Sequence, residues 1–212
     1  MNLSILVGSC DQYSFLWDKF IYLFNKYWSH SIKIDKFLLT ENLYLDNNDF
    51  KTIATGNIPW TQRLKFALDK IDTDYVLWLQ DDYFFIKNIS SDIFEEYFDF
   101  ITKNDVDRFG IHENSMLYNL KETNNKYFKF SQYSYYTLSL QASIWKKDFL
   151  LSCIDVDETP WQFEIDGSVR INSRPHNIFV DIQNPAWYLE AMKRGKHTND
   201  YYEICKREGM DS

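Results

Sequence analysis

Two adjacent carboxylates, Asp81 and Asp82, close an apolar run and are the strongest candidates for chemistry in this sequence. Residues 75–79 are aromatic, β-branched or aliphatic without alternation, which predicts a strand buried on both faces of a mostly parallel sheet. Open α/β sheets bind their ligands beyond the carboxyl ends of such strands. Neighbouring ionised carboxylates repel each other, so the pair predicts a divalent cation, Mn²⁺ or Mg²⁺, that also carries substrate phosphates. The alternative is a solvated turn after a core strand.

The loop of residues 8–11 is the second candidate. It joins a short apolar strand, residues 3–7, to a helix whose apolar residues recur at helical spacing over residues 17–28. Strand, polar loop and helix open a βαβ unit, which puts the loop at the carboxyl edge of the sheet. There Asp11 could accept hydrogen bonds from a base or a ribose. The alternative is that Asp11, like Ser9, caps the helix.

A second predicted helix leads directly into the strand that carries the acidic pair. Its apolar stripe lies within residues 64–71, and the first turn of a helix tolerates Pro59. Arg63 falls in the first turns, near the same edge of the sheet, where it could contact a phosphate or a base. The alternative is a solvated arginine on the helix surface.

A distant carboxylate, Glu164, is the candidate general base. We expect a helix from Pro160 whose Trp161 and Ile165 pack inward, which leaves Glu164 near one end of the sheet. A carboxylate beside a tryptophan in a partly apolar pocket can have its pKa raised towards neutrality, which suits proton abstraction. The alternative is an acidic helix N-terminus that complements the helix dipole. The competing carboxylates are Asp157, Glu158 and Asp166.

The last part of the chain carries a local cluster of positive charge. Lys193, Arg194, Lys196 and His197 lie within five residues around Gly195, in a chain that is otherwise acidic. Such a loop can fold over a diphosphate and supply a nitrogen ligand to its metal. The alternative is a solvated tail.

Strands and helices alternate along the chain, which predicts an α/β three-layer sandwich with a mostly parallel central sheet. Further strands are expected at residues 32–39, 106–111 and 178–182, and a helix follows Ser90 and Ser91, which are good capping residues. The 212 residues contain no linker or repeat, so we expect one domain.

Gln141 lies where a stretch of β-type residues, 135–142, meets a short predicted helix at residues 145–151. Gln141 is thus a polar group between two apolar elements, which makes it a candidate binding residue. The alternative is an ordinary amide at a strand end.

The composition excludes several classes of protein. Lys and Arg total 23 against 31 Asp and Glu, a net charge of −8, so no sequence-wide basic surface is available for nucleic acid. Cys10, Cys153 and Cys205 are odd in number and widely spaced, which argues against a disulfide framework or a zinc site. No apolar run is long enough to cross a membrane, and no basic leader precedes the first strand. We therefore expect a cytoplasmic protein, with contact at the inner face of the membrane left open.

Three stretches of the chain together resemble glycosyltransferases of the GT-A fold, in particular the bacterial enzymes that build lipopolysaccharide or capsule glycans. These stretches are residues 5–11, the segment from Trp60 and Arg63 to residues 79–84, and residues 161–168. The resemblance implies a Rossmann-like sandwich. In it, residues 1–110 bind the nucleotide sugar, and residues 111–212 bind the acceptor and supply the closing C-terminal loop.

On the donor side, the resemblance implies that Asp11 meets the base or ribose and that Arg63 meets the nucleotide, with Ser9 beside them. Asp81 and Asp82 would match the family's Asp-x-Asp element, which binds the ribose of the sugar nucleotide and its metal.

On the acceptor side, Glu164 would be the catalytic base of inverting members, with Gln141 and Trp161 as contacts of the acceptor. In the closing loop, Lys196 would contact the diphosphate and His197 would be the second metal ligand.

One position departs from the family pattern. The first Asp of Asp-x-Asp is Gln80 here, so one carboxylate is missing. The metal would then be held by Asp82 and His197 with the diphosphate. Alternatively, no metal is used, and Lys196 and Arg194 neutralise the leaving group.

We therefore expect an inverting, metal-assisted transfer of a sugar from a nucleotide diphosphate sugar to a hydroxyl of a glycan or a lipid-linked saccharide. The first rival, a nucleotidyltransferase, would carry a Gly-rich cationic loop after the first strand, whereas residues 8–11 have one Gly and no cation. The second rival, a non-catalytic carbohydrate- or metal-binding module, would show the short alternating strands of a β-sandwich.

Overall fold

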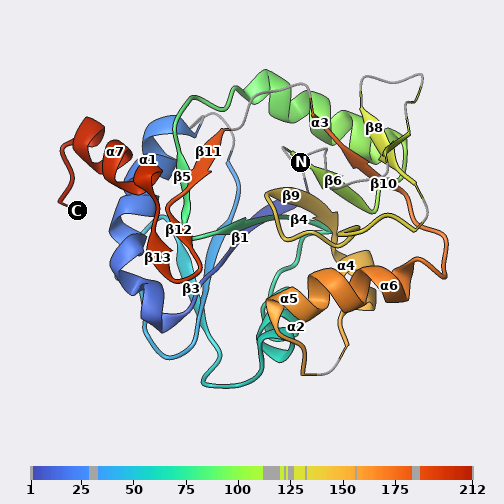
Figure 1. The fold of residues 1–212 in the computed structure, drawn as a ribbon, viewed down its shortest axis with the longest axis horizontal. Helices are drawn as coiled ribbons and strands as arrows, with labels where there is room; N and C mark the ends of the chain where they lie inside the picture. The colour runs from blue at the N-terminus through green and yellow to red at the C-terminus, as the bar shows by residue number, and fades with distance from the viewer. Residues whose placement is uncertain are drawn as a thin grey trace.

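The computed structural model of this chain describes residues 2–28, 33–111, 120–121, 123, 127–131, 133–155, 157–182 and 187–211. One large sheet runs through these residues (Figure 1). Its strands are β1 (Leu3–Gly8), β2 (Lys36–Thr40), β3 (Lys51–Ala54), β4 (Tyr75–Gln80), β6 (Arg108–Gly110), β7 (Leu120–Lys121), β8 (Phe128–Phe130), β9 (Ser143–Lys146) and β10 (Ile178–Val180).

The strand order is β3-β2-β1-β4-β9-β6-β10-β8-β7. Within the described residues, β9 and β8 run opposite to the other strands of this sheet, which all share one direction. The prediction of an α/β fold with a mostly parallel central sheet is therefore confirmed. The predicted strand at residues 75–79 is β4, which lies next to β1 near the centre of the sheet.

Helices cover both faces of the sheet, as the predicted three layers require. Ile5 of β1 and Leu77 of β4 belong to one apolar cluster, whereas Leu6 and Trp78 belong to the other, because successive side chains of a strand point to opposite faces. On the first face lie α1 (Trp17–Tyr27), α3 (Ser91–Lys103) and α7 (Asn199–Glu208). On the second lie α2 (Trp60–Asp69), α4 (Lys147–Cys153) and a helical stretch made of α5 (Pro160–Gln162), a π-helical turn (Phe163–Gly167) and α6 (Ser168–Ile171).

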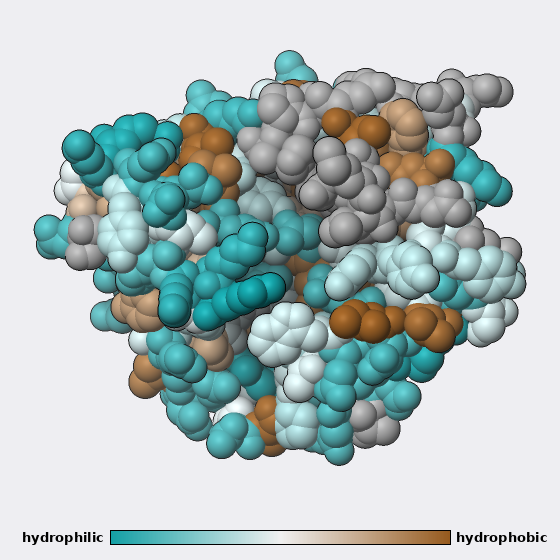
Figure 2. Space-filling view, in the orientation of Figure 1, coloured by the Kyte–Doolittle hydropathy of each residue, from teal (hydrophilic) through white to brown (hydrophobic). Residues whose placement is uncertain are grey.

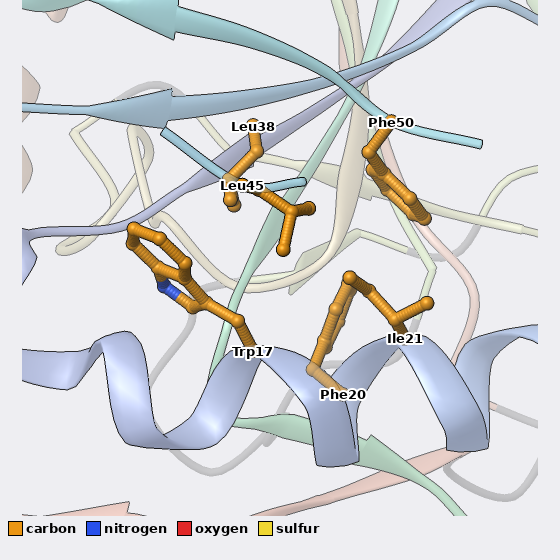
Figure 3. Close-up of a pocket in the computed structure, with 6 residues that line it drawn as sticks. All are labelled: Trp17, Phe20, Ile21, Leu38, Leu45 and Phe50. Atoms are coloured by element: carbon orange, nitrogen blue, oxygen red, sulfur yellow. The ribbon is translucent and has the colours of Figure 1, made fainter. Parts of the chain in front are cut away.

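Helix α1 packs on the sheet through the apolar stripe that the sequence predicts. A 3₁₀ helix (Asp11–Leu16) leads into it. Aromatic rings pack edge to face here, for example Phe20 and Phe50, whose centroids are 6.1 Å apart. Figure 3 shows the six side chains that surround a small apolar pocket at this contact, Trp17, Phe20, Ile21, Leu38, Leu45 and Phe50.

The cationic segment near the end of the chain is a β-hairpin. Strands β12 (Met192–Lys193) and β13 (Lys196–His197) are antiparallel. Arg194 and Gly195 between them have φ angles of 54° and 75°, the positive values that a two-residue hairpin turn of type I′ requires. Just before this hairpin, β11 (Tyr188–Glu190) pairs with β5 (Tyr83–Phe85), the strand that follows the acidic pair.

Several expected boundaries were wrong. Lys51–Ala54 forms the edge strand β3, which is missing from the predicted strands because Ile53 alone is strongly apolar there. Residues 135–142 lie in turns and irregular chain rather than in a strand. Trp145 belongs to β9 and is fully buried, and helix α4 begins two residues later at Lys147. Short apolar runs fit strand and helix equally well, which explains the error.

The expected inward packing of Trp161 and Ile165 was also wrong. They are 72% and 51% exposed, and Phe163 takes the buried position instead. The π-helical turn rotates the helix so that Phe163 and Gly167 face the core.

The capping prediction for α3 agrees with the structure. Ser90 caps α3, accepting a hydrogen bond of 3.3 Å from the N–H of Ile93. Cys10, Cys153 and Cys205 are free. None of the helices in the described part of the chain combines the length and the apolar character that a membrane span requires.

Candidate functional site

A cavity of about 490 Å³ lies at the carboxyl ends of β1 and β4. This is a typical volume for a small-molecule site. Its walls come from the N-terminal loop, the acidic pair, the start of α2, the α5 stretch and the β12–β13 hairpin. Of the predicted site residues, the cavity lining includes Ser9, Arg63, Asp81, Asp82, Trp161 and Glu164. The lining also includes Gly8, Cys10, Tyr13, Trp60, Trp78, Gln80, Leu140, Pro160, Met192, Arg194 and Gly195.

Asp81 is held from the N-terminal side. Its carboxylate accepts a hydrogen bond from the Ser9 hydroxyl, whose oxygen accepts one of 2.7 Å from the indole N–H of Trp17. Asp81 is 4% exposed. Burial raises the pKa of Asp81 to about 7, against the opposing effect of these hydrogen-bond donors.

Asp82 is the second carboxylate of the acidic pair. Its Oδ1 atom is buried and has no hydrogen-bond partner among the described residues. Burial, followed by repulsion from Asp81 and Glu190, raises the pKa of Asp82 to about 8. Within the described residues, no ion pair joins either carboxylate of the acidic pair to a cation.

The chemistry of this pair fits a divalent cation. A buried carboxylate oxygen without a partner is the kind of ligand that Mg²⁺ or Mn²⁺ takes, and such ions are commonly held by one or two carboxylates completed by phosphate oxygens. The part of the chain that the structure describes contains no group of three or more His, Cys, Asp and Glu side chains placed to hold a metal. The fit is therefore to an ion that the substrate helps to bind.

His197, the second predicted metal ligand, is not part of the cavity lining. Its ring stacks on Tyr201 at a centroid distance of 4.0 Å and meets the ring of Phe15 edge-on at 5.5 Å. Its Nε2 atom is buried without a hydrogen-bond partner among the described residues.

Arg63 is buried, which rules out the solvated alternative. It is 5% exposed, and its Nη2 donates to the carbonyl of Ser9 at 2.6 Å. Its Nη1 forms an ion pair of 3.2 Å with Glu41. Arg63 thus fixes the N-terminal loop while it forms part of the cavity wall.

Asp11 lies outside the cavity lining and fastens two loops together. Its carboxylate accepts hydrogen bonds from the backbone N–H groups of Glu41, Asn42 and Leu43, at 3.2, 2.9 and 3.2 Å. Slight burial opposes the effect, but these donors lower the pKa of Asp11 below its usual value. The capping alternative was wrong, because Cys10 occupies the N-cap position without a side-chain hydrogen bond.

Glu164 is held in the π-helical turn with its carboxylate at the cavity. Its Oε1 accepts a hydrogen bond of 2.7 Å from the N–H of Leu140. Its carbonyl accepts one of 2.5 Å from Ser168, whose hydroxyl oxygen in turn accepts one of 2.9 Å from the N–H of Leu138. π-Helical turns within helices are frequent at functional sites.

The competing carboxylates do not form part of the cavity wall. Asp157 and Asp166 are exposed. Glu158 forms an ion pair with Arg170 and is 11% exposed. The geometry therefore favours Glu164 among the candidate bases.

Two further predicted site residues lie outside the lining. Gln141 donates to Glu190 at 3.1 Å and accepts a hydrogen bond of 2.6 Å from Tyr188, so its amide is engaged beside the cavity rather than in it. Lys196 is exposed on β13.

Leu140 is a site residue that no sequence pattern predicts, because it acts through its backbone. Its carbonyl accepts hydrogen bonds from the Gln80 amide at 3.3 Å and from the Tyr83 hydroxyl at 3.1 Å. A carboxylate at position 80 could not donate this bond. The amide of Gln80 thus makes a hydrogen bond across the cavity wall.

Three-dimensional comparison finds the same architecture in TarS of S. aureus. A crystal structure of TarS 1-349 has a TM-score of 0.60 with this protein at 12% identity, over 98% of this chain and 64% of that one. The chain has the fold of TarS. The complex of TarS 1-349 with UDP gives 0.60 at 14% identity over 97% and 64% of the two chains, and the complex with UDP-GlcNAc gives 0.56 at 14% over 98% and 65%.

This chain thus spans slightly less than two thirds of the length of these TarS structures. No family model and no curated protein matches the sequence. At such identities the likeness to TarS establishes the fold, and it leaves the substrates of this chain to be argued from its own site.

Proposed function

We propose that this protein is an inverting glycosyltransferase that moves a sugar from a nucleotide diphosphate sugar to an acceptor hydroxyl. The observation that carries the proposal is the single cavity that collects the acidic pair, Arg63, Glu164 and the cationic hairpin turn. A fold shared with a protein crystallised with UDP and with UDP-GlcNAc supports the choice of donor.

The donor is proposed to bind at the ends of β1 and β4. Ser9 and Asp81 offer an oxygen-rich edge for the ribose, and the positive charge of Arg63 favours the nucleotide. Arg194 in the hairpin turn lies in the cavity wall, where its charge complements a diphosphate. Lys196, next to this turn, is proposed to add to the same effect from the hairpin edge.

A divalent cation is proposed to accompany the diphosphate, held by Asp82 with Asp81 nearby. Such an ion stabilises the negative charge of a departing nucleoside diphosphate. His197 remains the proposed second ligand, and its buried unpartnered nitrogen is the observation that supports it.

Glu164 is proposed to take the proton from the acceptor hydroxyl. A base on the acceptor side, opposite the leaving group, suits direct displacement with inversion at the sugar carbon. The N–H of Leu140 fixes the orientation of the Glu164 carboxylate. The exposed face of Trp161 at the cavity mouth suits stacking of an acceptor sugar.

The rival functions fit less well. The observed α/β sheet is not the β-sandwich that we expected of a carbohydrate- or metal-binding module. The N-terminal loop binds Arg63 through the carbonyl of Ser9 and offers no lysine or arginine of its own, unlike the loop expected of a nucleotidyltransferase. Roles in lipopolysaccharide or capsule synthesis, and a cytoplasmic location, stay predictions of the sequence.

The test is calorimetric binding of UDP, UDP-GlcNAc, UDP-glucose and other sugar nucleotides with Mn²⁺, followed by transfer assays with the donors that bind. We expect at least one nucleoside diphosphate sugar to bind and its free nucleotide to be released with transfer. Absence of binding by every nucleoside diphosphate and sugar nucleotide in the panel would refute the proposed function.

A further inference from the structure

Three apolar side chains are exposed in a row along the stretch from α5 to α6. Trp161, Ile165 and Val169 follow one another at intervals of four residues and are 72%, 51% and 68% exposed. Phe163 and Ile171 of the same stretch are buried in the core, so the row is the outer face. In Figure 2, hydrophobic groups lie together on the surface over this stretch.

The π-helical turn Phe163–Gly167 keeps this row straight. Residues four apart in an α-helix drift around the axis, because one turn takes 3.6 residues. The π-helical turn takes more residues, so Trp161, Ile165 and Val169 stay closer to one line. The same turn thus positions Glu164 and aligns the apolar row.

The row is continuous with the cavity. Trp161 begins the row and also lines the cavity, as does Glu164, the neighbour of Ile165 in the chain. A molecule that lies along the row therefore enters the cavity at the proposed base.

More aromatic surface lies in the segment that packs against this stretch. Tyr133 and Tyr135 are 70% and 78% exposed. They precede Leu138, whose N–H donates to Ser168 at 2.9 Å.

The charges along the stretch disfavour an anionic occupant. Arg170 is the only cation within residues 157–171, all of which the structure describes, and it is paired with Glu158. Asp157 and Asp166 are exposed carboxylates in the same segment. Anionic lipid headgroups or a nucleic-acid backbone would be repelled, whereas a neutral hydrocarbon would not.

We propose that the row binds the apolar part of an amphiphilic acceptor, a saccharide joined to a neutral hydrocarbon or lipid group. The sugar stacks on Trp161 beside Glu164, and the hydrocarbon crosses Ile165 and Val169. A plain glycan would leave these two aliphatic side chains uncovered, since they offer neither a π face nor a hydrogen bond. The inference rests on the proposed function and narrows its acceptor.

The test uses octyl glucoside, octyl galactoside and octyl N-acetylglucosaminide below their critical micelle concentrations, with the methyl glycosides of the same sugars as matched probes. Calorimetry is done on the full chain with UDP and Mn²⁺. We expect an octyl glycoside to bind at least about tenfold more tightly than its methyl partner, which burial of two methylene groups suffices to produce.

Two surface variants locate the effect. The double variant Ile165→Ser/Val169→Ser should lose the octyl preference, and Trp161→Ala should weaken both partners of each pair. Phe66→Ser, a change at a 43% exposed aromatic of α2, is the matched control and should keep the preference. Unchanged UDP affinity in each variant shows that the fold is intact.

Four results would overturn the inference. In calorimetry, these are equal affinity for octyl and methyl glycosides, or an octyl preference that survives Ile165→Ser/Val169→Ser. The other two are binding to sugar-free phosphatidylcholine vesicles as strong as binding to the octyl glycosides, and a wild-type dimer that the double variant turns into a monomer. If UDP binds while any of these is seen, only the acceptor inference fails. If UDP and the sugar nucleotides do not bind at all, the proposed function fails as well.

Discussion

The N–H of Leu140 donates a hydrogen bond of 2.7 Å to Oε1 of Glu164, across 24 residues of sequence. The carbonyl of Leu140 accepts from Gln80, which directly precedes the acidic pair. The proposed base and the proposed donor site are therefore tied to one residue. A shift of the Leu140 backbone would move Glu164 relative to the end of β4.

Glu164→Gln keeps the shape of the site and removes the proton acceptor. We expect turnover to fall by about 10²–10⁴-fold, the usual contribution of general base catalysis, while UDP affinity stays within about twofold. Steady-state kinetics and calorimetry measure the two effects. Asp166→Asn, at an exposed carboxylate, is the control and should be active. Normal turnover by Glu164→Gln with an inactive Asp166→Asn would move the base to Asp166.

Gln80→Leu removes one hydrogen bond to the Leu140 carbonyl. We expect kcat to fall by about twofold to tenfold, which corresponds to a neutral hydrogen bond of about 0.5–1.5 kcal/mol, with little change in UDP affinity. Gln80→Glu should be worse, because a carboxylate would face the carbonyl oxygen. A loss of UDP affinity as large as the loss in kcat would mean that Gln80 acts on the donor instead.

Asp82→Ala should remove the dependence of UDP binding on Mn²⁺. In the wild type we expect a chelator to weaken UDP binding, because it removes the cation that joins the diphosphate to Asp82. Titration calorimetry with and without EDTA measures this difference. Asp69→Ala, at an exposed position on α2, is the matched control. A wild type that binds UDP equally well with EDTA would remove the metal from the proposed function.

Gly8→Ala should destabilise the fold by about 1–3 kcal/mol, the cost of overpacking a filled core. A Cβ atom at this position would lie 2.4 and 2.6 Å from ring carbons of Trp78. Urea unfolding of both forms measures the change in free energy. In a Trp78→Leu background the same substitution should cost less, since the ring is gone, and an equal cost in both backgrounds would contradict the clash.

Acid should weaken the packing of α7 on α1. Burial of Glu208 acts to raise its pKa, but hydrogen bonds from Lys26, Arg207 and Tyr27 outweigh it and leave the pKa below its usual value. A lowered folded-state pKa stabilises the fold above the unfolded-state pKa, and the stability is lost as the pH falls through the folded-state value. Glu208→Gln should cost about 1 kcal/mol at pH 7 and less at pH 3, measured by urea unfolding at both. A cost that does not depend on pH would contradict this account.

The sequence predicted the central features because they follow from local patterns. The unbroken apolar run before Asp81 predicted β4, and the stripe from Trp17 predicted α1. The carboxyl-edge rule then placed the acidic pair, Arg63 and the N-terminal loop at one cavity.

The remaining errors come from features that local patterns do not encode. No spacing rule indicates a π-helical turn, so the predicted inward orientation of Trp161 was wrong. Glu164 nevertheless lies in the cavity wall at the end of the sheet. Asp11 was expected at a ligand or a cap because the partners of its carboxylate, backbone N–H groups about 30 residues away, have no sequence signature. Leu140 was overlooked for the same reason.

The side chain of Trp17 makes two kinds of contact, apolar contacts in the core and a hydrogen bond towards the cavity. Its ring packs with Ile21, Leu38 and the other side chains of Figure 3, and its N–H belongs to the chain of hydrogen bonds that ends on Asp81. A substitution that shifts the side chains packed beneath α1 can therefore move the Trp17 N–H and change the hydrogen bonding of Asp81 in the cavity. A search for inactive variants of this protein should therefore recover substitutions in that interior as well as in the cavity wall.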